Sequence, residues 1–471
     1  MKITEVIFRF MQSSGIFFLG TVLSKLISFL LLPIYTTLIP VADMGYYDIS
    51  ITYMNMAISF VFFEIWSAVL RFMYDGHTVE DKYKSVKSGM TIFFCSAVIY
   101  IVGGAILGRI IKIPHLNLIL VCGILQCMVS YYTFSARGFG KNVDFAISGI
   151  INVIINALIN IIMIVYLKYG FVAMYYGLIL GNIAQLLYLE LRLHIFTDSI
   201  QERFDKKEIV RMLRYALPLC LNTISYWFLT SFNRIALNWE LGNEANGLYA
   251  IGNRFGMLIT LVTTCFTYAW QDISFSYAGQ QHNEKNFYSN ACNLYMKFLM
   301  IGLYFLLPVS YYGFMLMINE NYQAAKETIP LSLMVGVLSA ISSFIGNVFY
   351  AIKDTKAIFV STIISALSNI IIVFPLVRIM GINGANFSAC IGFLINIIIR
   401  CLILRKKIDF SYNGKLFLTL LIISIPVFIY YNKMRLIESI WLWLFAVVMT
   451  IIVFKKEMIL FIKRNNFLKR K

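Results

Sequence analysis

Apolar runs of about 20 residues follow one another along almost the whole chain, separated by short turns rich in Gly, Pro and Asn. A helix of this length crosses the ~30 Å hydrocarbon core of a bilayer while its backbone hydrogen bonds are all made internally. Hydrophobic residues make up 60% of the chain and charged residues 13%, which excludes an ordinary soluble globular domain. The chain is therefore predicted to be an all-α polytopic membrane protein.

The apolar runs predict about fourteen transmembrane helices. They lie at about residues 11–37, 43–70, 87–108, 115–136, 143–167, 171–194, 211–238, 244–271, 287–312, 327–350, 355–377, 383–404, 414–431 and 436–454. The longest polar connections, at about 71–86, 195–210 and 272–286, are too short to form a soluble domain.

The placement of positive charge predicts how the chain lies in the membrane. The net charge is +17, and Lys and Arg concentrate in stretches that share one side if the N-terminus is inside: 71–87, 192–214, 400–415 and 455–471. Basic residues mark cytoplasmic segments and attract anionic lipid headgroups. The charge pattern predicts a multi-pass protein with both termini cytoplasmic and membrane lipids as partners, and it requires no nucleic acid.

Two segments of the first half return in the second half. The stretch MGYYDISITYMN aligns with NGLYAIGNRFGM 202 positions later, which matches Gly45 with Gly247. The fifth and sixth helices return as the eleventh and twelfth, with Asn160 matched to Asn369. Both segments keep their place among six helices, which favours a true repeat over chance similarity between Ile-rich helices.

An even number of helices in each repeat keeps both copies in the same orientation, related by an axis along the membrane normal. This predicts two pseudo-symmetric six-helix lobes, at residues 1–200 and 201–410. Residues 411–471 then hold a C-terminal helix pair and a basic cytoplasmic tail.

Four predicted helices carry polar side chains along one face. In the eighth helix they fall within an arc of about 100°: Asn246, Tyr249, Asn253, Thr260, Thr264, Tyr268 and Gln271. The first, second and seventh helices carry shorter stripes, which include Ser24, Lys25 and Ser28; Asp48, Thr52, Asn55 and Ser59; and Asn222, Tyr226 and Asn233. Such faces avoid lipid, so they serve either as hydrogen-bonding contacts between helices or as the lining of a hydrated cavity.

Three cations, Lys25, Arg234 and Arg254, lie on or beside these stripes within the predicted spans. A charge at the centre of a membrane helix costs roughly 2.5–3.5 kcal/mol on insertion scales, and such residues are most often functional. Lys297 lies near the inner end of the ninth helix, where it can extend to the headgroups. Lys25, Arg234 and Arg254, in contrast, predict a cationic cavity between the lobes. Such a cavity favours an anionic ligand such as a phosphate.

Few acidic residues accompany these cations. Asp48 lies near the outer end of the second helix, and Glu64 lies deeper, seven residues before Arg71 on nearly the same face. A structural ion pair of Glu64 with Arg71 or Lys25 and a role in ion coupling both stay open. The eight cysteines form no CxxC pair and the four histidines are scattered, so neither a metal site nor a cofactor is predicted.

Three stretches within residues 5–410 carry a family resemblance. They are SKLISFLLLPIYT with Lys25, SAVLRFMYD with Arg71, and YALPLCLNTISYWFLTSFNRIALNWELGNEANGLYAIGNRFG with Leu217-Pro218, Arg234 and Gly247–Tyr249. With six, six and two helices in order, the chain resembles the multidrug/oligosaccharidyl-lipid/polysaccharide exporter superfamily. Within it, the chain is similar to the polysaccharide transporter family, the flippases of O-antigen and capsule repeat units. Asn233 stands where that family usually has an acid, which removes a counter-ion for Arg234.

The resemblance implies a flippase in the bacterial cytoplasmic (inner) membrane. Such a protein moves undecaprenyl-diphosphate-linked oligosaccharide repeat units to the periplasmic leaflet by alternating access. Lys25, Arg234 and Arg254 would hold the diphosphate or acidic sugars. The side chains that would bond to sugar hydroxyls are Tyr249, Asn253, Tyr268 and Gln271. A polysaccharide polymerase and a chain-length regulator are the protein partners that the resemblance implies.

Three alternatives follow from the same residues. A cation-coupled multidrug exporter of the superfamily should carry acidic residues at mid-membrane, where this chain carries cations. A peptidoglycan-precursor flippase also needs an anion site, and the sequence does not separate it from a repeat-unit flippase. A membrane-embedded glycosyltransferase or polymerase should show a long periplasmic loop or an acidic pair, and the chain has no D-x-D, so no enzyme is predicted.

Overall fold

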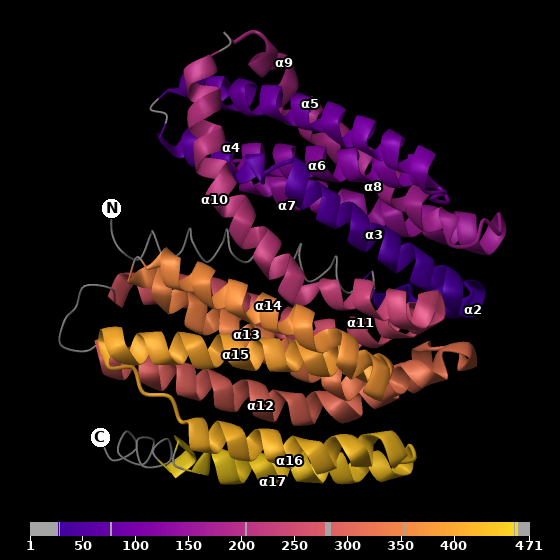
Figure 1. Cartoon of the computed structure of the whole chain (residues 1–471), viewed down its shortest axis with the longest axis vertical. Coiled ribbons are helices and arrows are strands. Elements are labelled where there is room, and N and C mark those ends of the chain that lie inside the picture. The colour runs from indigo at the N-terminus through magenta and orange to yellow at the C-terminus, as the bar shows by residue number, and fades with distance from the viewer. Residues whose placement is uncertain are drawn as a thin grey trace, which may run out of the picture. The chain divides into compact units, whose positions relative to one another are not determined.

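The computed structural model of the chain describes residues 27, 29–75, 78–202, 205–277, 284–352, 354–455 and 457–459. Within these ranges, the side chains at 264, 265, 267–269, 271–273, 275–277 and 284–286 are not described. The described backbone consists of helices joined by short turns and contains no strand (Figure 1). The predicted all-α class is thus confirmed for these residues.

The helices follow the apolar runs in order. Up to residue 230 they are α2 (Leu32–Leu38), α3 (Val41–Val61), α4 (Ile65–Asp75), α5 (Val79–Ile110), α6 (Leu116–Gly138), α7 (Asn142–Ile161), η1 (Ile162–Tyr166), α8 (Val172–Leu193), α9 (Ile195–Ile200) and α10 (Lys206–Thr230). Beyond it they are α11 (Phe232–Tyr277), α12 (Glu284–Met317), η2 (Glu320–Thr328), α13 (Ile329–Ala351), α14 (Thr355–Met380), α15 (Ile382–Ile408), α16 (Gly414–Lys433), η3 (Ile437–Ser439) and α17 (Ile440–Val453).

Nine helices of the described ranges are long and apolar enough to cross a membrane, and the bent pair α3–α4 makes a tenth if it counts as one span. These ten match the predicted second to sixth and ninth to thirteenth helices. The predicted first helix lies mostly outside the described residues, and the seventh and eighth fall on α10 and α11. The fourteenth falls on the shorter segment Ile437–Val453. The chain is a multi-pass membrane protein, while the total of fourteen and the two-lobe layout stay predictions.

Several helices extend beyond the ends that hydropathy predicts. The connection predicted at 71–86 is wrong, because α4 runs to Asp75 and α5 begins at Val79. Thr78 starts α5 with a reciprocal cap: its hydroxyl accepts from the Asp81 N–H, and the Asp81 carboxylate accepts from the Thr78 N–H, both at 3.1 Å. A capped helix continues outside the hydrocarbon core wherever its charged side chains are solvated, so the end of an apolar run does not mark the end of a helix.

The predicted continuous helix at 43–70 is also wrong. Phe63 and Glu64 have φ angles of 51° and 50°, in the left-handed region that residues other than glycine rarely adopt. They separate α3 from α4, whose axes are bent by 45°. Neither Gly nor Pro stands at the break, so the sequence carries no signal for it, and the surrounding packing must hold the strained backbone.

Contacts divide the chain into two compact units, Met1–Gly247 (unit 1) and Leu248–Lys471 (unit 2). In unit 1, helices α4, α5, α6, α8 and α10 share a core that includes Val69, Met90, Leu189 and Met212. In unit 2, helices α13, α14 and α15 pack together, and α16 and α17 lie along α12 (Figure 1). The predicted lobe boundaries at residues 200 and 410 stay predictions.

Gly45 of α3 and Gly247 of α11, which the sequence repeat aligns, lie against each other within unit 1. A Cβ on Gly45 would overlap the carbonyl oxygen of Asn243 and lie 2.7 Å from the nitrogen of Gly247. A Cβ on Gly247 would overlap the carbonyl oxygen of Val41 and lie 3.1 Å from the nitrogen of Gly45. The repeat also aligns Val41 with Asn243, so each contact has its counterpart. Such reciprocity marks a local two-fold axis, which supports the repeat at these helices.

Gly45→Leu is expected to lower the stability of the protein by about 1–3 kcal/mol or more, because the added side chain forces α3 away from α11. Gly247→Leu should have a similar effect, since the contact is reciprocal. The apparent melting temperature in detergent, followed by size-exclusion chromatography after heating, measures both. Gly103→Leu is the matched control, because nothing lies within 4 Å of a Cβ there. Equal losses at Gly45 and Gly103 would contradict the close contact.

A second pair of helices also packs in the way the repeat predicts. In unit 1, Asn152 Nδ2 of α7 donates to Gln185 Oε1 of α8 at 2.9 Å. The repeat aligns Asn152 with Ser361 of α14 and Gln185 with Asn396 of α15. The offset of the second pair is two residues longer than that of the first. In unit 2, Asn396 Nδ2 donates to the carbonyl oxygen of Ser361 at 3.1 Å. The same positions thus join α7 to α8 and α14 to α15, each pair inside its own unit.

The aligned asparagines lie at similar contacts. Asn160 of α7 is 1% exposed and packs against Gly177 of α8, where a Cβ would lie 3.1 Å from the Asn160 Cγ. Asn369 of α14 is fully buried and accepts a hydrogen bond of 2.6 Å from the Ser388 hydroxyl of α15. Both asparagines thus lie at a contact between two neighbouring membrane helices; Asn369 accepts a hydrogen bond across that contact, whereas Asn160 donates to Asn156 within α7.

Candidate functional site

Asp48, Arg234 and Asn246 form a polar cluster between α3 and α11 in unit 1. The Arg234 Nε lies 3.0 Å from the Asp48 Oδ2, and the two side chains are 18% and 23% exposed. Asn246 Nδ2 donates to the same carboxylate oxygen at 3.3 Å and to the carbonyl oxygen of Gly45 at 2.9 Å. The cluster holds an ion pair largely away from water, where salt screens the attraction weakly.

The counter-ion of Arg234 therefore comes from α3. Asn233, which stands where the family usually has an acid, is fully buried, and Asp48 supplies a carboxylate to Arg234 from a distant part of the sequence. Asp48 thus forms an ion pair in this conformation, and its role in ion coupling stays a prediction.

The rest of the polar stripe on α3 makes contacts between and within helices. Gln126 Nε2 of α6 donates to Asn55 Oδ1 at 3.0 Å. The hydroxyls of Thr52 and Ser59 donate to backbone carbonyl oxygens four residues earlier, at 2.8 and 3.0 Å. Asn55 was predicted to line the cavity. In this conformation it instead makes a hydrogen-bonding contact between helices, the other interpretation of this stripe.

Glu64 and Arg71 have different partners. Arg71 pairs with Asp75 one turn along α4, with Nη1 and Oδ1 2.7 Å apart and both side chains more than half exposed. Glu64 occupies the break between α3 and α4 and lies beside Thr223 of α10. The interpretation of Glu64 and Arg71 as an ion pair is therefore wrong, because the break in the helix removes the common face on which that pairing depended.

In unit 2, the middle of α11, around Gly252 and Gly256, packs against η2 and α13. A Cβ on Gly252 would lie 3.1 Å from the Ala325 carbonyl oxygen, and one on Gly256 would lie 2.8 Å from the Ser332 carbonyl oxygen. Tyr249 lies on this packed side and is only 3% exposed. In this conformation it fills the interior of the unit rather than facing an open cavity.

The polar face of α11 lies beside this packed side, one residue or about 100° around the helix. Asn253 and Thr260 are half-buried, and Met257 between them is 50% exposed. The Thr260 hydroxyl donates to the carbonyl oxygen of Met257 at 2.7 Å. The described polar residues of this face are therefore partly exposed, whereas Tyr249 is buried.

The other predicted site residues are only partly placed. Arg254 is half-buried beside Asn253. Lys25, Ser24 and Ser28 lie outside the described residues, as do the side chains of Thr264, Tyr268 and Gln271. The predicted grouping of Lys25, Arg234 and Arg254 into one cationic cavity stays a prediction.

Lys297 has a specific partner. Its Nζ lies 2.7 Å from Oε1 of Glu457, which follows α17, and the two side chains are 15% and 38% exposed. Lys297 was predicted to extend toward the headgroups, and its pairing with Glu457 was not predicted. The pair ties α12 to the end of the last helix, because the two charges lie far apart in sequence but adjacent in unit 2.

Arg400 of α15 is the most deeply buried arginine of the described residues, and it was not among the predicted site residues. It is 6% exposed, although the sequence grouped it with the basic stretch 400–415. Its Nη1 donates to the carbonyl oxygen of Ser342 at 2.5 Å and to the Ser342 hydroxyl at 3.0 Å. Its Nε and Nη2 donate to the hydroxyls of Ser361 and Thr362 at 3.1 and 3.3 Å. The repeat could have flagged this region, since Asn396, one turn earlier, is the counterpart of Gln185.

The fold is that of a multi-pass membrane transporter. Over 93% of this chain and 99% of the other, it matches the lipid II flippase MurJ in an inward closed conformation, with a TM-score of 0.71 at 16% identity. It also matches an inward-facing multidrug resistance MATE family transporter of the MOP superfamily, over 82% and 94% of the two chains, with a TM-score of 0.67 at 14% identity. At these identities the likeness concerns the fold.

The family is shown by the sequence. The family model described as polysaccharide biosynthesis protein matches residues 10–270, which is more than half of the chain. The chain therefore belongs to this family and has the fold of the MOP exporter superfamily, as the motifs around Arg71 and Arg234 predicted. No functionally curated protein shows significant similarity to the chain.

Proposed function

We propose that the protein is a flippase for undecaprenyl-diphosphate-linked oligosaccharides. It moves O-antigen or capsule repeat units from the cytoplasmic to the periplasmic leaflet of the bacterial inner membrane by alternating access. In this proposal both termini are cytoplasmic. A polysaccharide polymerase and a chain-length regulator take up the product on the far side.

The observation that carries the proposal is the family match over residues 10–270. The likeness to a lipid II flippase over nearly the full length of both chains adds to it, because both substrates would pair a lipid diphosphate with a sugar. The described site residues suit such a ligand. Asn253 and Thr260 carry hydrogen-bonding groups on the partly exposed polar face of α11, and Arg234 and Arg254 carry guanidinium groups, which make charge-assisted hydrogen bonds to phosphate oxygens.

The ion pair of Arg234 with Asp48 provides a way to release the substrate, because Asp48 can take the place of the diphosphate at Arg234. A guanidinium that is neutralised by Asp48 in this conformation binds an anion less strongly than one whose carboxylate has moved away. Exchange of Asp48 for a diphosphate during the transport cycle would therefore couple substrate binding to a change of conformation.

A peptidoglycan-precursor flippase is the second candidate, favoured by the match to the lipid II flippase. A cation-coupled multidrug exporter is the third, favoured by the MATE match. The three differ in what they move: a lipid-linked oligosaccharide repeat unit, a lipid-linked peptidoglycan precursor or a cationic drug.

Complementation separates the candidates. The parent chain is expected to restore surface polysaccharide to a bacterium that lacks its own repeat-unit flippase, and Lys25→Ala, Arg234→Ala and Arg254→Ala should each lose most of that activity at equal membrane expression. Arg71→Ala is the matched control, because its pair with Asp75 is exposed. Rescue of a strain that lacks its lipid II flippase, or drug resistance without polysaccharide, would replace the proposal by the second or third candidate.

A further inference from the structure

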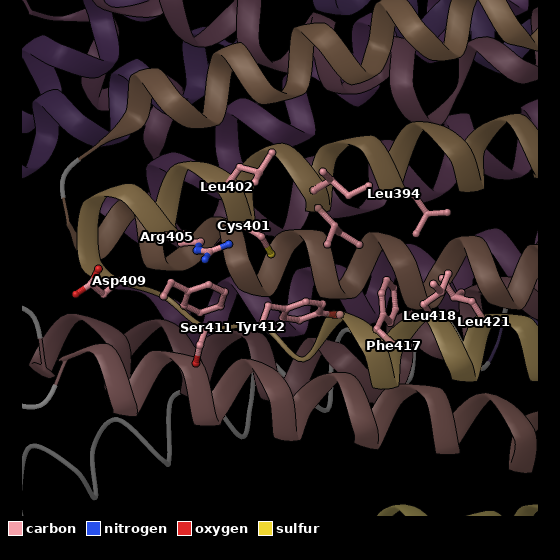
Figure 2. Close-up of a pocket in the computed structure, with 14 residues that line it drawn as sticks. Leu394, Cys401, Leu402, Arg405, Asp409, Ser411, Tyr412, Phe417, Leu418 and Leu421 are labelled. Atoms are coloured by element: carbon pink, nitrogen blue, oxygen red, sulfur yellow. The ribbon is translucent and has the colours of Figure 1, made fainter.

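A cavity of about 770 Å³ lies between α15 and the start of α16 in unit 2. Most of its walls are apolar and come from both helices; they include Leu394, Ile397, Leu402, Phe417, Leu418 and Leu421. In Figure 2, Tyr412 and Phe417 lie on one wall of the cavity, Leu402 lies on the opposite wall, and Leu394 lies toward the end away from Asp409. A pocket of this size and lining fits an apolar ligand or an alkyl chain.

One end of the cavity is basic. The Arg405 guanidinium lies at this end, and the Asp409 carboxylate lies at its outer edge (Figure 2). The segment from Arg405 to Lys415 contains four cations and one carboxylate, and Lys407 is paired with Asp354 at 2.5 Å. Burial raises the pKa of the Tyr412 phenol, so this wall carries no charge. The basic end thus favours an anion beside an apolar channel.

The dimensions match one leaflet of a bilayer. Leu394 and Arg405 lie eleven residues apart on α15, which corresponds to about 17 Å along the helix axis. Half of the ~30 Å hydrocarbon core is about 15 Å, the depth that one acyl chain of a phospholipid occupies. With Arg405 at headgroup level, Leu394 would lie near the middle of the bilayer. A longer polyprenyl chain would overrun the channel.

We propose that this cavity is a binding site for one membrane phospholipid with an anionic headgroup. The phosphate contacts Arg405, and one acyl chain fills the space between α15 and α16. The lipid completes the packing of α16, because the apolar side chains that line the cavity would otherwise face a gap. The site does not depend on the transported substrate, and its occupant comes from the surrounding membrane.

Native mass spectrometry of the purified full-length chain tests this site. After delipidation, the protein is titrated with palmitoyl-oleoyl phosphatidylglycerol or with the zwitterionic phosphatidylcholine of the same chains. The parent is expected to bind one phosphatidylglycerol with an affinity about tenfold higher than that for phosphatidylcholine. Arg405→Gln should remove this preference. Arg435→Gln, at the other end of α16, is the matched control and should keep it.

Filling the channel tests the acyl-chain part of the site. Leu394→Trp and Leu418→Trp each place a large ring in the cavity and should abolish the tight phosphatidylglycerol site, with Arg435→Gln again as the control. Elution as a single peak on size-exclusion chromatography shows that a variant folds. Equal affinity for both lipids, a preference that survives Arg405→Gln, or tight binding that survives both tryptophans would overturn the proposal. Displacement of phosphatidylglycerol by lower concentrations of undecaprenyl phosphate would assign the cavity to a prenyl lipid instead.

Discussion

Arg400→Ala is expected to destabilise the protein by about 1–3 kcal/mol or more, the usual cost of leaving buried hydrogen-bond acceptors without their donor. Arg400 is 6% exposed and donates to Ser342, Ser361 and Thr362, so it joins α13, α14 and α15. Its removal leaves these buried acceptors with fewer donors in a region that water does not reach. The result should be a large drop in the apparent melting temperature in detergent.

Two further variants separate the charge from the hydrogen bonds at this position. Arg400→Lys keeps the charge, but the lysine ammonium lacks the planar guanidinium that donates to both α13 and α14. An intermediate loss of stability is therefore expected. Lys406→Ala is the matched control, since Lys406 lies on the same helix and is exposed. If the Arg400→Ala and Lys406→Ala variants had the same apparent melting temperature, the hydrogen bonds of Arg400 would contribute little to stability.

Arg234→Gln is expected to reduce transport at least tenfold, because it removes a cation that the proposed function assigns to the diphosphate. The same change leaves Asp48 half-buried without its guanidinium, so stability should fall as well. The two effects can be separated by exchanging the charges. The double variant Asp48→Arg/Arg234→Asp should recover the melting temperature but not transport, since the cation now stands on α3.

The exchange is measured by melting temperature and by surface polysaccharide in the complementation strain. The exposed pair Arg71–Asp75, with the same charges exchanged, is the control and should change neither. If the exchanged pair of Asp48 and Arg234 restored full transport, Arg234 would act only as a structural partner of Asp48. Its assignment to the diphosphate would then be wrong.

Features that depend on local sequence were predictable. The apolar runs located the membrane helices, because a helix in lipid must be apolar over its whole span. The repeat predicted that Gly45 and Gly247 are equivalent, and their reciprocal contact agrees with it. The motifs around Arg71 and Arg234 predicted the family that the match over residues 10–270 shows.

Features that depend on tertiary contacts were not predictable in this way. Asp48 and Arg234 are 186 residues apart, and only the folded chain shows that they pair. Arg400 was assigned to a solvated basic stretch, since nothing near it in sequence reveals that α13 and α14 cover it. The break at Phe63 and Glu64 has no Gly or Pro to announce it, so it too follows from packing.

The most direct test of the central claim is transport by the purified protein. The chain is reconstituted in proteoliposomes with a fluorescent undecaprenyl-diphosphate oligosaccharide, and the fraction of label that reaches the outer leaflet is measured by quenching from outside. The parent protein is expected to transfer the label, and the variant with Lys25, Arg234 and Arg254 all changed to Gln is expected to lose this transfer. No transfer by the parent with any lipid-linked oligosaccharide, or equal transfer by the triple variant, would contradict a flippase that works through cationic side chains.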